Sequence, residues 1–557
     1  MQMMGASSRG RVQTATVPPY ASAPDARSID NAFSEGVKAY DIGAYDEALR
    51  HFKMVVAARH DDADAQNWLG LTHFKQHDLD DAGDCFVLAT HFRPGFAEAW
   101  YHLALVAQRR NDHRDAVSCL ERALAARADY AEAHNALGAS ALALGDVPRA
   151  VECFEQAISL RPEYAHAHSN LGYVLFRDCG EYERGAAHIR TALDLNRGDP
   201  NIWCNQTMVL THEGRLEEAI SVCDQLLAAR QDLDEARLNR ALALLRLGRF
   251  AQAWPDYEAR KTVRSNYIRR PFDFPEWRGE ALANKTILVH AEQGIGDEVM
   301  FAGCLPDLLA MAGRCVFECA PRLEQLFRRS FPGAIVHGSE QSDTDMSWLA
   351  SIGHIDFQIA AGSLPGHFRR QWSDFPRHAG YLKADPARIE YWRGRTLALG
   401  AGLRVGIAWR GGLVSTRRDL RSTRLDQWLP LLRQENCHFV SLQHGDGGAG
   451  AAALAGAHAL TVHHWQEAVD DIDETAALIS TLDLVVSVQT ATVHLAGALG
   501  RPVWVLVPAV PEWRYLQSGD VMPWYPSARL LRQSQAGEWN PVMAAAAFEL
   551  KRLAAES

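Results

Sequence analysis

Small side chains recur at a fixed spacing through the first half of the chain. The spacing is 34 residues, with a single step of 35 residues before Gly185. The recurring positions are Ala48, Ala82, Ala116, Ala150, Gly185, Ala219 and Ala253. A period of this length predicts a stack of helix-turn-helix units, because one unit cannot bury its apolar face alone.

Two further positions keep the same phase and define the helix pair. Starting the units at Ile29, Ala63, Ala97, Ala131, Ala165, Pro200 and Asp234 puts a small residue at the eighth position of most units. The twenty-fourth position is large in most units, beginning with Phe52 and Phe86. We therefore expect the small residues to let the two helices approach closely, and the large ones to fill the gap between neighbouring units.

Over residues 29–262 this pattern resembles the tetratricopeptide-repeat family. The resemblance implies a right-handed superhelix of seven repeats whose first helices line a concave groove. Asparagines lie near the groove phase, at Asn67, Asn135, Asn170, Asn205 and Asn239. Because an amide both donates and accepts hydrogen bonds, these residues could hold the backbone of a peptide segment. The alternative is that they are polar residues on a solvated helix face.

Beyond the repeats the pattern changes to short apolar runs that alternate with helical stretches. Residues 263–285 read as a linker, and Thr286–His290 as a buried strand followed by a glycine turn. Two blocks of such alternation, residues 286–400 and 401–557, predict two Rossmann-like α/β domains. Further predicted strands are Arg314–Glu318, Ala334–His337, Phe357–Ile359, Arg404–Trp409, His438–Leu442, Leu484–Val488 and Val503–Val507. Helices are predicted at Val299–Met311, Leu425–Leu432, Asp473–Leu482 and Thr490–Leu499, whereas Ala449–Leu460 is ambiguous.

Composition excludes several classes of protein. The formal net charge is −11 over 557 residues, whereas nucleic-acid scaffolds are usually basic. No apolar run is long enough to span a bilayer, and residues 1–28 look like a disordered tail rather than a secretory signal. The ten cysteines include no pair two residues apart, so we expect reduced thiols in a cytoplasmic protein.

The most informative chemistry lies where a strand passes into a helix. The predicted strand ends at Val488, and free N–H groups at the following helix start suit a diphosphate together with the Thr490 hydroxyl. His494 lies one helical turn later on the same side. The alternative is an ordinary helix cap with no ligand. Ligands bind at the carboxyl ends of parallel strands, so we expect the loops after His290, Trp409, Leu442 and Val488 to surround one cleft.

Several motifs in order give this region a family resemblance. They are Gly294-Ile-Gly296-Asp297, the segment Ser487 to Ala496, Gly500-Arg501-Pro502, Trp513-Arg514 and Pro523-Trp524-Tyr525-Pro526. Over about residues 275–555 they resemble the heptosyltransferase-like glycosyltransferases. That resemblance implies the two-domain glycosyltransferase-B fold, a nucleotide-sugar donor and hexosyl or heptosyl transfer. Repeats fused to such a unit are also similar in architecture to O-linked N-acetylglucosamine transferases.

The resemblance implies a role for each matching residue. Asp297 would be the general base that takes the acceptor proton, unless it caps the next helix. The remaining donor-binding candidates are Gly294, Gly296, Arg410, Gly411, Arg421, Gln443, Gln489, Thr490 and His494. The arginines would neutralise charge on the departing nucleotide, with Arg417 and Arg418 as competitors, or they belong to an exposed basic loop. Gln443 would meet the nucleobase or ribose.

One position departs from the family pattern. An acidic residue usually precedes the threonine, and here it is Gln489, which keeps hydrogen-bonding reach but loses the charge. The cleft loops contain no Asp-x-Asp motif, and Asp470-Asp471-Ile472-Asp473 reads as an acidic helix start, so we expect no metal and no cofactor.

Three functions follow as hypotheses. The first is a glycosyltransferase whose acceptor, a protein or a glycan or lipid-linked molecule, is recruited by the groove. The second is a non-catalytic adaptor with a degenerate transferase domain, which Gln489 favours. The third, an epimerase or hydrolase of the sugar nucleotide, would have no need of a docking groove.

Overall fold

The computed structural model describes residues 26–263, 270, 272–342, 345–412 and 418–556. The chain forms two compact units, one ending at Leu171 and the other beginning at Gly172. The boundary falls inside the repeat array rather than at its end, so the last repeats belong to the same unit as the α/β region. Residues 1–25 of the expected tail, and most of the first half of the expected linker, lie outside the described residues.

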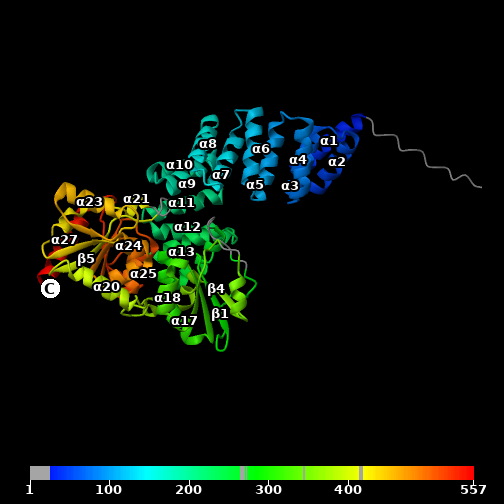
Figure 1. Cartoon of the computed structure of the whole chain (residues 1–557). Coiled ribbons are helices and arrows are strands. Elements are labelled where there is room, and N and C mark those ends of the chain that lie inside the picture. Colours follow the sequence, from blue (N-terminus) through cyan, green and yellow to red (C-terminus); the bar gives the residue numbers. More distant parts are fainter. Residues whose placement is uncertain (1–25, 264–269, 271, 343–344, 413–417, 557) are drawn as a thin grey trace, which may run out of the picture. The chain divides into compact units, whose positions relative to one another are not determined.

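The repeats are pairs of antiparallel helices, coloured from blue to green in Figure 1. Six of the seven first helices begin at the residue expected from the period, and the other begins at Ala26, so residues 26–28 are helical. The helices are α1 Ala26–Asp41, α2 Tyr45–Ala58, α3 Ala63–Lys75, α4 Leu79–Phe92, α5 Ala97–Arg109, α6 His113–Ala126, α7 Ala131–Ala143, α8 Val147–Leu160, α9 Ala165–Val174, α10 Tyr182–Leu195, α11 Pro200–His212, α12 Leu216–Ala229, α13 Asp234–Arg246 and α14 Phe250–Tyr257.

The small residue at the eighth position contacts the large one within its own repeat. A Cβ on Gly70 would lie 2.7 Å from the Phe86 ring, and one on Gly138 would lie 2.7 Å from the Phe154 ring. The large residue also reaches the next repeat, since the rings of Phe52 and Trp68 stack with centroids 6.0 Å apart. The expectation that it fills only the gap between repeats was therefore incomplete.

The single 35-residue step has a structural cause. Helix α9 ends in a π-helical turn over Leu175–Cys179. A π turn accommodates one extra residue without breaking the helix. The turn closes on Gly180, whose φ of 74° lies in the left-handed region, and the array then resumes its period.

The asparagines near the groove phase bond along the array. The Asn170 side-chain amide donates to Asn135 Oδ1 at 2.9 Å, and Asn67 Oδ1 lies 2.9 Å from His102 Nδ1. Asn239 donates to the carbonyl of Cys204 and to the Thr207 hydroxyl. Much of their hydrogen-bonding capacity thus joins one repeat to the next, leaving fewer donors for a peptide than the sequence suggested.

A four-stranded parallel sheet follows the array. Its strand order is β3-β2-β1-β4, formed by β1 Thr286–His290, β2 Arg314–Cys319, β3 Ala334–Gly338 and β4 Phe357–Ala360. The helices of this part are α15 Arg260–Val263, α16 Ile295–Phe301, α17 Leu305–Met311, α18 Glu324–Ser330 and α19 Pro365–Phe368. The single helix expected over Val299–Met311 is instead two helices joined by a 3₁₀ turn at Ala302–Cys304.

The second sheet has seven strands in the order β10-β11-β9-β8-β5-β6-β7, and only β10 is antiparallel to its neighbour. The strands are β5 Leu403–Ala408, β6 Cys437–Ser441, β7 Val462–His464, β8 Leu484–Val488, β9 Val503–Val507, β10 Val521–Met522 and β11 Tyr525–Arg532. The helices are α20 Pro386–Leu397, α21 Arg418–Arg421, α22 Leu429–Leu432, α23 Gly447–His458, α24 Gln466–Asp470, α25 Ile472–Ile479, α26 Ala491–Ala498 and α27 Asn540–Glu556. Figure 1 shows β5 in yellow with α23, α24 and α27 around it.

The last repeats share a core with both sheets. One cluster of buried apolar side chains runs from Leu216 in α12 to Leu530 in β11. Polar contacts reinforce it, since the Trp254 indole N–H donates to the carbonyl of Arg369 at 2.7 Å. Arg246 of α13 bonds the side chain of Gln517, whose own N–H donates back to the Arg246 carbonyl. These contacts explain why the compact unit begins within the array.

Candidate functional site

Both sheets reverse their strand order at a defined place. In the first sheet the chain moves outward from β1 in one direction and returns to the other side at β4, and in the second sheet β5 and β8 flank the same kind of reversal. Ligands of open α/β sheets bind in the crevice beyond the carboxyl ends of such strands. The loop after β5 carries Arg410 and Gly411, and the loop after β8 carries Gln489 and Thr490, so four of the predicted residues border one crevice.

Asp297 lies in the first turn of α16, where a carboxylate is favoured by the helix dipole. The helix begins at Ile295 with Gly294 as its N-cap, so Asp297 does not cap it, contrary to the alternative interpretation. Its carboxylate instead bonds the guanidinium of Arg514, whose Nε lies 2.7 Å from Asp297 Oδ1. The pair is largely shielded from solvent, with side-chain exposures of 19% and 13%.

The glycine turn and the strand-to-helix turn lie directly against each other. A Cβ on Gly296 would stand 3.2 Å from the His494 ring and 3.4 Å from the Cα of Ala491. Glycine therefore lets α16 approach α26 closely. The two places that the sequence singled out are 194 residues apart in the chain (491 − 297) but adjacent in the fold.

Thr490 is the N-cap of α26. Its hydroxyl accepts from the Thr492 N–H at 3.2 Å and lies 3.1 Å from the Ser487 hydroxyl. His494 is 4% exposed, and its Nδ1 lies 3.1 Å from the Tyr525 hydroxyl. Burial lowers the pKa of His494 to about 3, with the charges of Arg514 and Arg421 adding to the effect. The imidazole is thus neutral at physiological pH and can act as a hydrogen-bonding group, not as a cation.

Gln489 leaves a polar atom without a partner. The side chain is 2% exposed, and its Oε1 accepts from the Glu512 N–H at 3.5 Å. Within the described residues, its Nε2 is buried and has no hydrogen-bond partner. A buried donor in this state costs free energy that a ligand oxygen would recover.

The loop after β5 borders a cavity of about 400 Å³. Arg410 lines it together with Trp409, Asp446 and Thr423. The Arg410 guanidinium bonds Asp446 and remains half exposed. A space of this volume can hold part of a drug-sized ligand.

Gln443 and the other loop residues are held by contacts within the protein that the sequence did not indicate. Gln443 Oε1 accepts from the N–H groups of Trp409 and Arg410, and its Nε2 donates to the His444 carbonyl. It therefore shapes the loop after β5, rather than presenting its amide to a ligand. A Cβ on Gly411 would lie 2.2 Å from Thr490 Cγ2, so any larger residue there would have to displace the Thr490 side chain. Arg421 lies in α21, close enough to His494 to lower its pKa, whereas Arg417 lies outside the described residues.

The acidic run at Asp470–Asp473 begins a helix, as expected. Asp471 is the N-cap of α25, and its side chain accepts from the N–H groups of Asp473 and Glu474. Asp471 is thus committed to the helix start, while Asp470 accepts from Gln466 and Asp473 pairs with Arg329.

Two residues near the site were missed as functional candidates. Arg514 belonged to a motif noted in the sequence, yet nothing local indicates that it would pair with a carboxylate 217 positions away. Glu298 follows Asp297, is 2% exposed and accepts from the Ala320 N–H at 2.9 Å. Burial raises the pKa of Glu298 to about 7, a property that depends on tertiary packing.

Comparison with known families identifies the repeats. Tetratricopeptide-repeat profiles match residues 33–95, 95–163, 136–201 and 175–234. This part of the chain is therefore a tetratricopeptide-repeat array, and such repeats serve protein interaction.

A curated relative extends the similarity beyond the repeats. Protein FlbA of Caulobacter vibrioides is 31% identical over an alignment of 385 residues that covers 66% of this chain and 63% of FlbA. This length exceeds that of the whole array, so the match includes part of the α/β region. The chain spans less than two thirds of the length of this relative.

Several solved structures are similar to this chain over about a third of its length. A MamA protein matches at 24% identity and a TM-score of 0.28, over 30% of this chain and 92% of MamA. PilF of Pseudomonas aeruginosa matches at 15% identity and a TM-score of 0.35, over 38% and 96% of the two chains. YrrB, a protein described as having an unusual peptide-binding site, matches at 17% identity and a TM-score of 0.27, over 33% and 95%.

Among the described helices, none combines the length and apolar character needed to cross a membrane.

Proposed function

We propose that the chain is a glycosyltransferase of the glycosyltransferase-B fold that moves a sugar from a nucleotide-sugar donor to an acceptor recruited by the repeat array. The observation that carries this proposal is the contact between α16 and the start of α26. It sets a carboxylate, Asp297, beside a helix N-terminus suited to a diphosphate. In this proposal the carboxylate would act as the base and the helix N-terminus as the anion site for one substrate.

The donor diphosphate would lie at the N-terminus of α26. The Thr490 hydroxyl, the buried Nε2 of Gln489 and the N–H groups of the first turn would bind its oxygens. The nucleoside would extend into the cavity beside Trp409 and Arg410. Neutral His494 would hold a sugar or phosphate oxygen by a hydrogen bond.

Asp297 would take the proton from the acceptor hydroxyl. The acceptor oxygen then forms a bond to the anomeric carbon, while the bond from that carbon to the diphosphate breaks and its electron pair leaves with the nucleotide. Arg514 would move from Asp297 to the diphosphate as the donor binds, which frees the base and stabilises the negative charge of the leaving group. Holding both reactants in one crevice would supply much of the acceleration.

The test begins with a panel of nucleotide sugars incubated with the full-length chain and a lysate of its host cell. Intact-mass measurement of the products would name the sugar and the acceptor together. Asp297→Asn should lower the transfer rate by about a thousandfold, within the range reported for loss of a key catalytic group, and should keep nucleotide affinity nearly unchanged.

Asp307→Asn supplies a matched control, because Asp307 also pairs with an arginine, Arg369, in the same α/β domain. It should transfer sugar at the normal rate. Equal activity in both variants would remove Asp297 from the mechanism.

A non-catalytic adaptor is the second candidate, and Gln489 favours it because it lacks the usual negative charge. The adaptor would bind nucleotide sugar, or nothing, without turnover. Calorimetry with the donor panel, followed by a turnover assay, separates the two: binding without product supports the adaptor.

A further inference from the structure

The second repeat buries a histidine where its neighbours carry alanine. His73 occupies the eleventh position of its repeat, and the first, third and fourth repeats have Ala39, Ala107 and Ala141 there. His73 is 5% exposed. Burying an imidazole in an apolar interface costs free energy unless its nitrogens gain partners.

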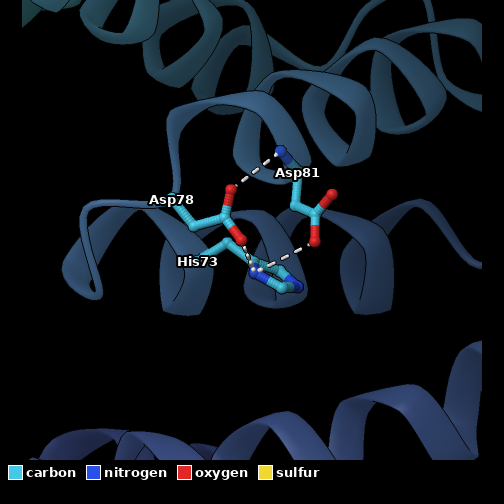
Figure 2. A group of neighbouring side chains, drawn as sticks. All are labelled: His73, Asp78 and Asp81. Atoms are coloured by element: carbon cyan, nitrogen blue, oxygen red, sulfur yellow. Dashed lines mark hydrogen bonds and ion pairs between the residues drawn. The ribbon is translucent and has the colours of Figure 1, made fainter.

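Two carboxylates face the buried imidazole, as Figure 2 shows. Asp78 is the N-cap of α4, where its Oδ1 accepts from the Asp81 N–H, and its Oδ2 lies 3.4 Å from His73 Nδ1. Asp81 Oδ2 lies 3.7 Å from the same nitrogen. The backbone fixes this arrangement, because the Asp78 N–H donates to the His73 carbonyl at 3.0 Å.

His73 Nδ1 has no hydrogen-bond partner among the described residues, although it is buried and aimed between two oxygens. All three ligand atoms lie within 4.8 Å of one another. Bonds of about 2.0–2.2 Å to a tetrahedral zinc ion place its ligand atoms roughly 3.3–3.6 Å apart. The observed separations of 3.4 and 3.7 Å from Nδ1 are close to that spacing.

We propose that the second repeat holds a divalent transition metal of the Zn²⁺ class, bound by His73 Nδ1 and one oxygen each of Asp78 and Asp81. One imidazole with two carboxylates is a ligand set that such ions accept. Both carboxylates are partly exposed, with side-chain exposures of 45% and 60%, so water completes the coordination. The ion would join the end of α3 to the start of α4.

The third repeat offers an internal control. It has the same cap, with Asp112 accepting from the Asp115 N–H, and the same turn, with the Asp112 N–H donating to the Ala107 carbonyl at 2.8 Å. Only the imidazole is missing. Ala107→His should therefore create a second site of the same kind.

The experiment titrates the full-length chain, free of any purification tag, with Zn²⁺ by calorimetry and with Co²⁺ by visible absorption. Both titrations are done at about pH 7.5, and release of a proton on binding is followed in the same calorimetric runs, since metal binding displaces protons from its ligands. The wild type should bind about one Zn²⁺ that His73→Ala does not, and Asp81→Asn should bind it at least about tenfold more weakly. Ala107→His should add about one equivalent.

His73→Ala is expected to fold, because alanine occupies this position in three other repeats, and far-ultraviolet circular dichroism checks this. If it does not fold, Asp81→Asn alone decides the outcome. Equal Zn²⁺ binding by the wild type and the folded variants would overturn the proposal and leave His73 as a plain ion-pair partner of the two carboxylates.

Discussion

Each sheet reverses its strand order once, between β1 and β4 in the first sheet and between β5 and β8 in the second. The crevices at these two points are built alike, but different groups occupy them. In the first sheet a Cβ on Gly362 would lie 2.2 Å from Glu292 Oε1, and in the second a Cβ on Gly411 would lie 2.2 Å from Thr490 Cγ2. In each crevice, glycine on one loop permits contact with a side chain from the other.

The first crevice is closed by α15, at the end of the repeat array. Arg260 of α15 is fully buried and bonds both oxygens of Glu292, while the Gly362 N–H donates to the same carboxylate at 2.9 Å. In the second crevice, Gln489 Nε2 has no hydrogen-bond partner among the residues that the structure describes, and a cavity lies beside Arg410. The difference shows that the same topology can be used in two ways. One reversal point is filled by contacts that hold the end of the repeat array, and the other is the one to which our proposed function assigns a ligand.

Removing the Arg260–Glu292 ion pair should have the largest effect on stability. Arg260→Ala leaves the Glu292 carboxylate buried and uncompensated, so we expect a loss of about 3–5 kcal/mol of stability. Urea unfolding followed by tryptophan fluorescence measures it, because most of the 15 tryptophans lie beyond the repeats.

A paired variant separates charge burial from packing. Arg260→Met with Glu292→Gln removes both charges and keeps an acceptor for the Gly362 N–H, so it should recover most of the loss. A double variant as unstable as Arg260→Ala would show that the ion pair is not what anchors the array.

The repeats were predictable from the sequence because their signal is local and recurs at one period. The strands Thr286–His290, Leu484–Val488 and Val503–Val507 were also predicted with the bounds the structure has, since each is a short run of mostly apolar residues. Strand β7 has only three residues, and β11 contains Pro526, so neither produced a recognisable pattern.

The candidate site was predictable only in part. The rule that ligands lie at strand ends picked out the segments that carry Asp297 and Thr490, and α16 and α26 do lie in contact. That contact joins two different sheets, so it depends on packing and not on the topology of either sheet. The pairing of Arg514 with Asp297, and of Arg260 with Glu292, depends on how distant segments pack. The sequence predicts that Gln443 lies in a loop after a strand, which is why it was assigned to a ligand. Its hydrogen bonds to the backbone of the loop after β5 could not be predicted from the sequence.

Substituting Gly362 in the first crevice and Gly411 in the second should test the difference between the crevices with smaller effects. Gly362→Ala forces a methyl group against a carboxylate that Arg260 holds in place, so we expect a loss of about 1–3 kcal/mol of stability. Gly411→Ala should displace Thr490 and weaken nucleotide-sugar binding by about tenfold, or about 1.4 kcal/mol.

Gly394→Ala is the control, because nothing lies within 4 Å of the added Cβ in helix α20. It should be neutral or slightly stabilising. If Gly411→Ala left donor affinity unchanged while Gly362→Ala weakened it, the assignment of the two crevices would be reversed.

Acid should lower the free energy of unfolding through one buried histidine at each crevice. The two losses should be similar to each other and smaller than those above. Burial lowers the pKa of His290, at the end of β1, to about 4 and that of His494, in α26, to about 3. The unfolded chain takes up these protons near pH 6.5, while the folded chain resists until far lower pH. Stability is therefore complete above about pH 6.5 and falls as the pH drops, by about 1 kcal/mol for each histidine between pH 6.5 and 5.5. Unfolding of His290→Gln and His494→Gln at both pH values should each show about 1 kcal/mol less pH dependence than the wild type. A pH dependence unchanged in both buried-site variants would mean that these imidazoles take up protons alike in the folded and the unfolded chain, and that the fold does not hold His494 neutral in the second crevice.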